Sequence, residues 1–512
     1  MTKTSARWEW RSFGRYFGPA ETKIAALPAG SPQDSDELYL LSGNGANVKI
    51  RDALMDIKAL REVDANGLEQ WTPVMKAGFP LPAATAAEVL RALGLAVPAS
   101  LQDSYTQDEF FARFCAPGSA VRIVPVHKRR VRYTVDGCMA ELSEVVADGQ
   151  GTRTLAVEAE DPAAVIAAVR GLGLGGHINT SYPVGLAALV ARTPERFAVI
   201  DAGTNSIKFI VAERAAGDSW RAVVDRAEIT RLGEGLTPGG AIADAARDRA
   251  AEAVTRMAEE ARSHGVGAIV AVGTAGLRMA SNGAQVVEAI RQRSGVAIEI
   301  ISGDEEARLA FVAARAGLGL DRGSLVIFDT GGGSTQLTFG HDDAVDERFS
   351  VDVGAVRYTE RFKLDGTVSE DTLREALAAI AEDLSRLDSR TAPDALAAMG
   401  GAVTNIAAVR HGLATYDPDV VQGTVLDRVE IDRQIGMYRT QDAEARRGIV
   451  GLQPQRADVI LAGACIVRTV MEKLGKQQLS VSDRGLRHGI LAERFGLRAN
   501  EPRHDTSAWS AG

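Results

Sequence analysis

The 512-residue chain is poor in cysteine, with three residues and no pair spaced as CxxC. Neither a disulfide framework nor a zinc site is therefore expected, and we interpret the three as buried thiols in a reducing cytoplasm. No apolar run reaches the roughly 18 residues of a membrane-spanning helix, and the N-terminal residues lack the apolar core of a signal peptide. These absences predict a cytoplasmic protein without a membrane partner.

The chain also lacks a net positive charge. The net charge is −9, and lysine supplies only 10 of the 58 basic residues. Because broad nucleic-acid binding depends on neutralising many phosphates, this balance argues against a nucleic-acid partner. A composition rich in arginine, alanine and glycine is typical of a GC-rich genome, so no single arginine is evidence of a site by itself.

The length exceeds what one hydrophobic core organises, so we expect about two to three domains. Residues 1–192 combine short strand patterns with two amphipathic helices near 82–94 and 161–172, which indicates an α+β or barrel-like domain. A short linker, 193–196, follows. Long alanine-rich helices then alternate with buried strands, an α/β pattern, to about residue 498. The tail, 499–512, is expected to be disordered.

One signature occurs twice in the α/β half. FAVIDAGTNSIKFIVA (197–212) and LVIFDTGGGSTQLTFG (325–340) each lead from an apolar strand through an aspartate and a turn into a second strand. Asp201 and Asp329 occupy equivalent positions in the two copies. The repeat predicts two similar lobes, 193–318 and 319–498, that face each other across a cleft.

The second copy places three consecutive glycines in its turn. Glycine permits positive φ and close backbone approach, so such a turn can present several N–H groups to one anion, most often phosphate. A dinucleotide fold or a P-loop would continue into a helix, whereas strand-like alternation follows here. We therefore predict a phosphate-gripping hairpin, with an ordinary tight hairpin as the alternative. The GxGxxG match at 171–176 follows a helical pattern, and we interpret it as a helix end.

Eight motifs of this half resemble those of the exopolyphosphatase/guanosine pentaphosphate phosphatase (Ppx/GppA) family. They are DAGTNSIK (201–208), VGTAGLR (272–278), IISGDEEAR (300–308), FDTGGGST (328–335), DVGAVRYTERF (352–362), MGGAVTNIA (399–407), GLQPQRADVILAG (451–463) and SDRGLRHGIL (482–491). The resemblance covers about residues 196–495 in motif order. It implies two ribonuclease-H-like lobes of the actin, sugar-kinase and Hsp70 type, and transfer of a terminal phosphoryl group to water.

The resemblance also implies roles for single residues. Asp201 and Asp329 would hold Mg²⁺ or Mn²⁺, for which hard oxygen ligands are suited. Glu306 would activate the attacking water, and Arg278 would neutralise charge on the transferred group. The expected phosphate-binding residues of the two turns are Gly203, Thr204, Asn205, Ser206, Lys208, Gly331, Gly332, Gly333, Ser334 and Thr335.

Two local patterns qualify these roles. Ser302 and Glu305 form a capping box, which leaves Glu306 either as the catalytic base or as a surface carboxylate favoured by the helix dipole. The family usually has a glutamate after DxGGGST, where this chain has Gln336. A neutral amide thus replaces a carboxylate that assists the metal or the water, and reduced activity, another substrate or loss of activity are open alternatives.

The glycine turn of GGAVTN (400–405) would contact phosphate or a nucleoside, or else serve tight strand–helix packing.

Charged residues repeat on one face of several strand patterns in residues 1–192, as Arg7, Glu9 and Arg11 do. Such a face is unusual on an apolar core but is expected for a barrel with a charged, wet interior. A solvated, charge-striped sheet is the alternative. The predicted polyanion-binding residues are Lys49, Arg51, Lys58, Arg122, Lys128, Arg130 and Arg132.

This pattern resembles the CYTH, or triphosphate-tunnel, family over about residues 5–190. The resemblance implies that basic side chains grip a polyanion inside a barrel and that glutamates, here Glu158 and Glu160, hold a divalent metal. The opening ExExK of that family is reduced to Arg7-Trp8-Glu9-Trp10-Arg11, which keeps one glutamate and a basic end.

Together the two resemblances predict a Mg²⁺-dependent exopolyphosphatase that acts on inorganic polyphosphate or triphosphate. The tunnel-like domain would bind, feed or separately hydrolyse the same polyanion. A guanosine pentaphosphate phosphatase, a non-catalytic polyphosphate sensor and an ATP-dependent kinase are the alternatives. A homodimer stays open.

Overall fold

The computed structural model describes residues 6–204, 206–215, 219–236, 239–320, 322–342 and 344–496. The chain forms two compact units. The first is Met1–Ile300 with Arg494–Gly512, and the second is Ile301–Glu493. The tail expected at 499–512 lies outside the described residues. Within the described ranges, every helix is too short or too polar to cross a membrane.

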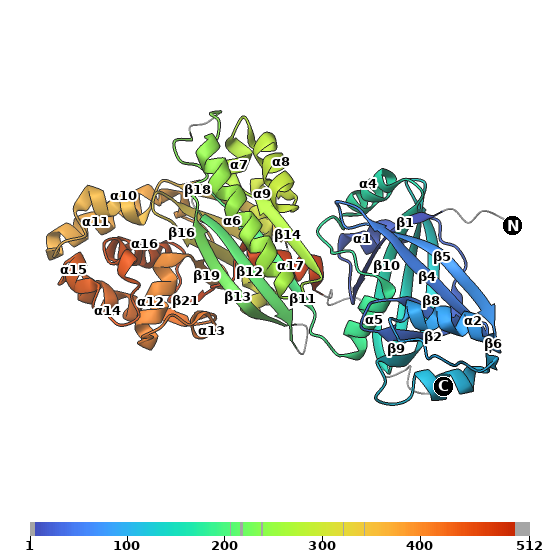
Figure 1. Ribbon diagram of the computed structural model, residues 1–512. Helices are drawn as coiled ribbons and strands as arrows, with labels where there is room; N and C mark the ends of the chain where they lie inside the picture. Colours follow the sequence, from blue (N-terminus) through green and yellow to red (C-terminus); the bar gives the residue numbers. More distant parts are fainter. Residues whose placement is uncertain are drawn as a thin grey trace. The chain divides into compact units, whose positions relative to one another are not determined.

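Eight antiparallel strands of the first unit close into a barrel (Figure 1) in the order β1-β10-β9-β8-β2-β3-β4-β5. Closure is completed by β1, which pairs with β10 on one side and with β5 on the other. The barrel predicted from the charge pattern is therefore confirmed. The strands are β1 Arg7–Gly14, β2 Gln33–Ser42, β3 Asn47–Arg51, β4 Leu54–Val63, β5 Glu69–Gly78, β8 Val121–Val135, β9 Cys138–Ala147 and β10 Gln150–Ala159.

Helices cover the outside of the barrel. The apolar side of α4 (Pro162–Leu172) and α1 (Pro19–Ala25) packs on the tryptophans of β1 in one buried cluster. A second cluster joins α2 (Ala83–Ala92) and α3 (Gln107–Phe114), beside β6 (Leu81–Pro82) and β7 (Ser104–Tyr105), to β2, β3 and β4. Both expected helices, 82–94 and 161–172, are confirmed. Gly173 ends α4 in the left-handed conformation, so the GxGxxG match is a helix end.

Helix α5 (Tyr182–Val190) fills one end of the barrel interior. Its Tyr182 and Leu186 form a buried cluster with inward side chains of β2, β8 and β9, among them Tyr39 and Val126. Because alternate residues of a strand share a face, the next inward positions after these apolar residues are charged, for example Lys128 after Val126. The helix thus covers the apolar half of the interior and leaves the charged half as a cavity.

Two sheets of the same strand order form the α/β half. The first, β13-β12-β11-β14-β15, belongs to the first unit, and the second, β18-β17-β16-β19-β21-β20, to the second unit. In each, an antiparallel hairpin meander is followed by parallel strands, which confirms the repeat. The first sheet consists of β11 Arg196–Ala202, β12 Ser206–Arg214, β13 Trp220–Ile229, β14 Ala268–Gly273 and β15 Ile298–Ile300. The second consists of β16 Ser324–Thr330, β17 Thr335–His341, β18 Ala344–Val351, β19 Ala395–Met399, β20 Val425–Asp427 and β21 Gln478–Val481.

Alanine-rich helices bury the faces of these sheets. In the first unit, the apolar face of α6 packs on β11 and β12, and in the second unit α16 is buried nearly all round. The helices of the first sheet are α6 Asp244–Ser263, α7 Ala275–Met279 and α8 Gly283–Ser294. Those that follow are α9 Gly303–Gly317, α10 Ala355–Phe362, α11 Glu370–Asp383, α12 Gly401–His411, α13 Pro418–Val421, α14 Arg428–Arg439, α15 Ala443–Arg446, α16 Ile460–Lys473 and α17 Leu486–Phe495.

Candidate functional site

The first repeated turn joins β11 to β12. Asp201 is buried near the end of β11, and its Oδ2 lies 4.0 Å from Nζ of Lys208, its partner in the strand register. The N–H of Gly203 donates to the carbonyl of Ser206 at 3.1 Å and closes the turn. Asn205, a predicted phosphate ligand, lies outside the described residues. The turn therefore keeps the expected aspartate beside a short backbone loop.

Thr204 fixes this turn against neighbouring glycines. A Cβ atom at Gly233 would lie 2.3 Å from Thr204 Cγ2, and one at Gly276 would lie 3.0 Å from Thr204 Oγ1. Gly276 belongs to α7, the helix that also carries the exposed Arg278. The first turn and the predicted charge-neutralising arginine are thus parts of one packed structure.

The second repeated turn joins β16 to β17 and is built in the same way. The N–H of Gly331 donates to the carbonyl of Ser334 at 2.9 Å. The carbonyls of Gly331 and Gly332 accept hydrogen bonds from N–H groups of the first turn of α10. A Cβ atom at Gly354 would lie 2.3 Å from the Gly332 carbonyl oxygen, so only glycine lets α10 approach the turn this closely. The backbone of this turn is therefore held rigidly in place.

The end of the turn has one open and one buried position. A Cβ atom at the exposed Gly333 would meet nothing within 4 Å. Thr335 is fully buried, and its hydroxyl donates to the carbonyl of Val353 at 2.6 Å. Packing thus accounts for the threonine hydroxyl, and its role as a phosphate ligand stays a prediction.

Asp329 lies exposed near the end of β16, opposite Gln336 in the register with β17. In the first hairpin, Asp201 and Lys208 occupy the corresponding places. A Cβ atom at Gly400, whose φ is 87°, would lie 2.0 Å from Asp329 Oδ1, so this glycine leaves the space that the carboxylate occupies. A carboxylate held next to a glycine-rich turn has the oxygen chemistry that a Mg²⁺ ion bridging to phosphate requires.

Glu306 lies half-buried in the first turn of α9. Ser302 is the N-cap, since its hydroxyl oxygen accepts the N–H of Glu305 at 3.1 Å. The Glu305 carboxylate accepts two hydrogen bonds from Arg308, at 2.8 and 2.7 Å. The two neighbouring glutamates therefore differ: Glu305 serves the helix, and Glu306 is the candidate base.

A cavity of about 190 Å³ occupies the charged half of the barrel. It is smaller than the roughly 300–1,000 Å³ of sites for drug-sized molecules, so a compact, polar ligand suits it. The predicted residues that line it are Lys49, Arg51, Lys58, Lys128, Arg130, Arg132 and Glu158. Further charged residues in its lining are Glu9, Arg11, Asp56 and Glu141.

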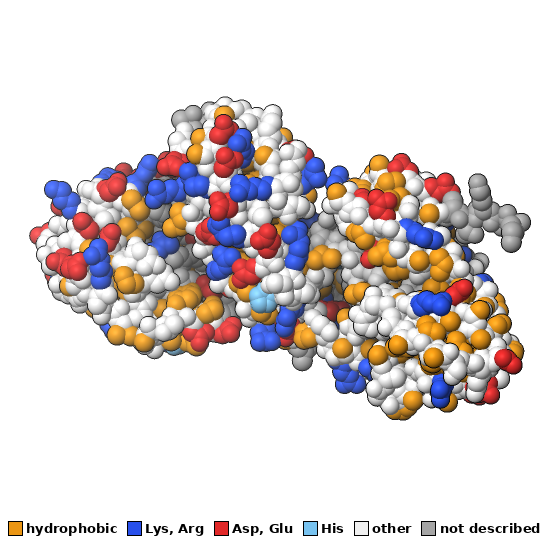
Figure 2. All heavy atoms as spheres, viewed as in Figure 1, with side chains coloured by type: hydrophobic (Ala, Val, Ile, Leu, Met, Phe, Trp, Pro, Cys, Tyr) orange, Lys and Arg blue, Asp and Glu red, His pale blue; other side chains and the backbone are white. Residues whose placement is uncertain are grey.

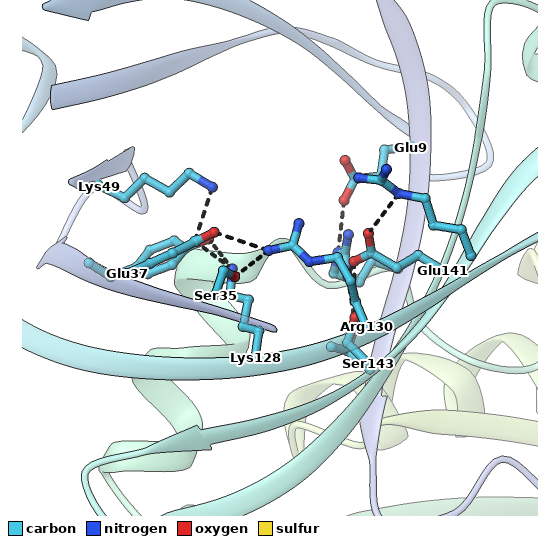
Figure 3. Close-up of polar contacts among 12 residues, drawn as sticks. Glu9, Ser35, Glu37, Lys49, Lys128, Arg130, Glu141 and Ser143 are labelled. Carbon is cyan, nitrogen blue, oxygen red and sulfur yellow. Dashed lines mark hydrogen bonds and ion pairs between the residues drawn. The ribbon is translucent and has the colours of Figure 1, made fainter. Parts of the chain in front are cut away.

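Glu37, which the sequence analysis did not select, lies at the centre of the basic residues (Figure 3). Its carboxylate is fully buried and accepts hydrogen bonds from Lys128 at 2.7 Å, Lys49 at 3.0 Å and Arg130 at 3.4 Å. Burial raises the pKa of Glu37, but Lys128 and Lys49 outweigh burial and bring it to about 2. The carboxylate is therefore ionised at any physiological pH. Glu37 lies two residues before the buried Tyr39, so strand alternation places both side chains on the same face and would have identified Glu37 from the sequence.

Two tyrosines enclose the most deeply buried of these cations. Lys128 Nζ donates to the Tyr39 hydroxyl at 2.8 Å and lies 3.8 Å from the centre of the Tyr182 ring. Burial lowers the pKa of Lys128 well below its ordinary value, and the neighbouring Lys49 adds to this effect. Stacking over aromatic faces offsets part of that cost.

Two predicted barrel residues lie outside the cavity lining. Arg122 lies toward the end of β8 that α5 covers, is exposed, and pairs with Asp148 at 2.6 Å, outside the cavity lining. Glu160 is exposed and also outside the lining, whereas Glu158 is in it.

Across the described parts of the chain, no three His, Cys, Asp or Glu side chains are grouped so that they could hold a metal ion.

The surface lacks a comparable concentration of positive charge on the face seen in Figure 2. Lysine and arginine side chains are interspersed there with aspartate and glutamate. This mixture agrees with the net charge of −9.

The repeated sheets with aspartate-bearing hairpins define a two-lobed α/β protein of the actin-like class. The profile of the family described as "Ppx/GppA phosphatase family" matches residues 210–496. The chain belongs to the Ppx/GppA phosphatase family and is therefore a hydrolase of the phosphatase type. The barrel strands lie outside this match, and the closed barrel is compatible with the expected triphosphate-tunnel domain.

Similar proteins support this assignment. "Exopolyphosphatase 2" of Mycobacterium tuberculosis is 34% identical over 325 residues, which cover 59% of this chain and 99% of the relative. "Exopolyphosphatase 1" of the same species is 25% identical and covers 60% of this chain and 90% of that protein. The crystal structure of the Aquifex aeolicus Ppx/GppA phosphatase, type II variant, is 28% identical, with a TM-score of 0.55 over 59% of this chain and 99% of that one.

We expect Gly400→Ala to lower the rate of orthophosphate release by at least about tenfold, because the added methyl group takes the place of the Asp329 carboxylate oxygen. Gly412→Ala is the control. Gly412 ends the same helix, α12, with a φ of 63°, and a Cβ atom there would meet nothing within 4 Å. Initial rates and thermal melting of both variants make the comparison. An equal loss of rate in the two would indicate backbone strain instead of displacement of Asp329.

Proposed function

We propose that this protein is a Mg²⁺-dependent exopolyphosphatase that removes the terminal phosphate of inorganic polyphosphate in the cytoplasm. The observation that carries the proposal is the turn at 331–334, whose backbone is held by α10 beside the Asp329 carboxylate. A rigid group of N–H donors next to a carboxylate is what binding of a metal-bound phosphate chain requires. The similarity to two mycobacterial exopolyphosphatases supports the choice of substrate.

In this proposal, Asp201 and Asp329 hold Mg²⁺ or Mn²⁺, which supplies positive charge to the phosphate oxygens when it is bound. The backbone of the two turns binds the last phosphates of the chain. Glu306 takes a proton from the attacking water, and Arg278 offsets the charge of the phosphoryl group as it moves. The anhydride bond breaks, so that orthophosphate leaves and the shortened chain carries the new end.

We further propose that the barrel interior binds the same polyanion. Seven lysine and arginine side chains line the cavity against four carboxylates, and counting Glu37 as a fifth still leaves an excess of positive charge. Direct ion pairs from arginine and lysine are the usual means of binding phosphate oxygens. A polyanion would therefore find a concentrated positive potential in a cavity of small volume.

A second function, binding of polyphosphate without hydrolysis, is favoured by one observation. Gln336 faces Asp329 across the hairpin, at the position where the family usually has a carboxylate. Phosphate release from long-chain polyphosphate, tripolyphosphate and guanosine pentaphosphate, each with Mg²⁺, separates this function from the hydrolase and identifies the preferred substrate.

We expect Glu306→Gln to reduce phosphate release from polyphosphate by about 100-fold or more, because the amide cannot accept the proton of the water. Glu305→Gln is the matched control, since the same change one residue away acts on a carboxylate that is ion-paired to Arg308. Its rate should stay close to that of the wild type. Wild-type rates for Glu306→Gln would mean that another group is the base.

We expect Gln336→Glu to raise the turnover number several-fold, because it restores a carboxylate opposite Asp329. Gln336→Ala, which removes the amide without adding charge, should not raise it. Steady-state rates at saturating Mg²⁺ and polyphosphate measure the effect. A Gln336→Glu protein no faster than wild type would show that this position does not limit the chemistry.

We expect Arg130→Ala to weaken tripolyphosphate binding at least about tenfold, or ~1.4 kcal/mol, because Arg130 lines the cavity. Arg122→Ala removes an arginine of the same strand that lies outside the cavity lining, so its affinity should match that of the parent protein. Calorimetric titration in the Glu306→Gln background, which prevents turnover, gives both affinities. Equal losses in the two variants would contradict a specific site in the barrel.

A further inference from the structure

The carboxylates on the β1 side of the barrel cavity are each paired with an arginine. Arg11 Nε lies 2.8 Å from Glu9 Oε1. Arg132 Nε lies 3.8 Å from Glu141 Oε2, and Arg11 Nη1 lies 4.0 Å from the other oxygen of Glu141. Positive charge within the chain therefore already offsets the acidic groups that a metal would use.

Arg7 stands where the triphosphate-tunnel pattern has its first glutamate. Its Nη1 lies 3.7 Å from Oε1 of Glu158, one of the two predicted metal ligands. Glu9 and Glu158 face each other in the register of β1 with β10, so Arg7 and Arg11 flank this pair along β1. A cation thus lies beside Glu158 at the position where the tunnel pattern has a glutamate, and the other predicted ligand, Glu160, is exposed outside the cavity lining.

The electrostatics of the pair agree with this arrangement. Burial raises the pKa of Glu158, and the adjacent Glu9 raises it further. Burial also raises the pKa of Glu9, but Arg11 and Lys58 outweigh burial, so that the pKa lies below its ordinary value. A divalent ion between these two carboxylates would meet like charge from the same basic groups. Because Arg7 and Arg11 are ion-paired to Glu158 and Glu9, these residues do not fit the metal that the tunnel resemblance implies.

We propose that the barrel binds the phosphate chain directly through its basic side chains, without a divalent metal, and holds the chain without hydrolysing it. The inference rests on the proposed polyanion binding of the barrel. Lys49, Arg51 and Arg130 are the groups suited to transfer bonds to phosphate oxygens, because the side chain of each keeps some solvent exposure, from 12% to 31%. Lys128, which is more deeply buried, stays with the carboxylate.

Titration of the full-length Glu306→Gln protein with tripolyphosphate, once in excess EDTA and once in Mg²⁺, tests the proposal. The binding that Arg130→Ala removes identifies the barrel site. We expect that binding to persist in EDTA and to be at least as tight there, since Mg²⁺ neutralises part of the charge of the phosphate chain. Binding at this site only with Mg²⁺ would overturn the inference alone. Absence of an Arg130-dependent site in both buffers would overturn the proposed function of the barrel and the inference with it.

A second measurement uses Mn²⁺ alone as the probe, with electron paramagnetic resonance of the full-length protein to count bound ions. We expect Glu158→Gln to leave the count unchanged, whereas Arg7→Glu should add a Mn²⁺ site and Arg7→Ala should not. Loss of a Mn²⁺ ion in Glu158→Gln would overturn the proposal. An Arg7→Glu protein that folds, as shown by its melting curve, but gains no ion would overturn the role given to Arg7.

Discussion

The catalytic half depends on a backbone contact that side chains would forbid. At the second hairpin, α10 begins directly on the turn, and the place where its N-cap residue Gly354 would carry a Cβ atom is already filled by Gly332 and Gly333. The hydrogen bonds from α10 to the turn carbonyls follow from this approach. In the first lobe, Gly233 approaches Thr204 closely in a similar way, and its N–H donates to the Thr204 carbonyl at 2.8 Å. In the proposed function, these glycines let the turns present the rigid set of N–H groups that phosphate binding requires.

The barrel solves a different problem, which is to keep many like charges together in a confined space. Glu37 makes this arrangement stable: one buried carboxylate binds Lys128, Lys49 and Arg130 and reduces their mutual repulsion. Removing that carboxylate would leave buried cations without compensation, which costs far more than the exposed ion pairs elsewhere in the chain. The chain has only ten lysines, and three of them line this cavity. Such a concentration is not explained by composition.

Local patterns in the sequence predicted the architecture well. The repeated signature and the strand alternation after the glycines gave the two hairpins, and the charge alternation gave the barrel. Helix α5 was missed because its apolar residues have no polar face. The same helix explains the placement of Arg122. Alternation assigns a residue to a face of a strand, but it does not tell which end of the barrel a later helix will cover.

The parts of the candidate site that depend on contacts between distant segments could not be predicted from the sequence. The carboxylate of Asp329 depends on the missing side chain of Gly400, 71 positions further along the chain, and no local pattern relates the two. Arg7 could be recognised in the sequence as a departure from the ExExK motif. Its ion pair with Glu158 followed only from the strand register, which brings the two residues together. In the proposed functions, the two halves handle one kind of ligand by different means. Hydrolysis needs charge that is strongest on the reacting phosphate, which a divalent ion supplies, whereas holding a chain needs charge spread along it, which fixed side chains supply. An arginine in place of a metal ligand suits the second task and is a poor choice for the first.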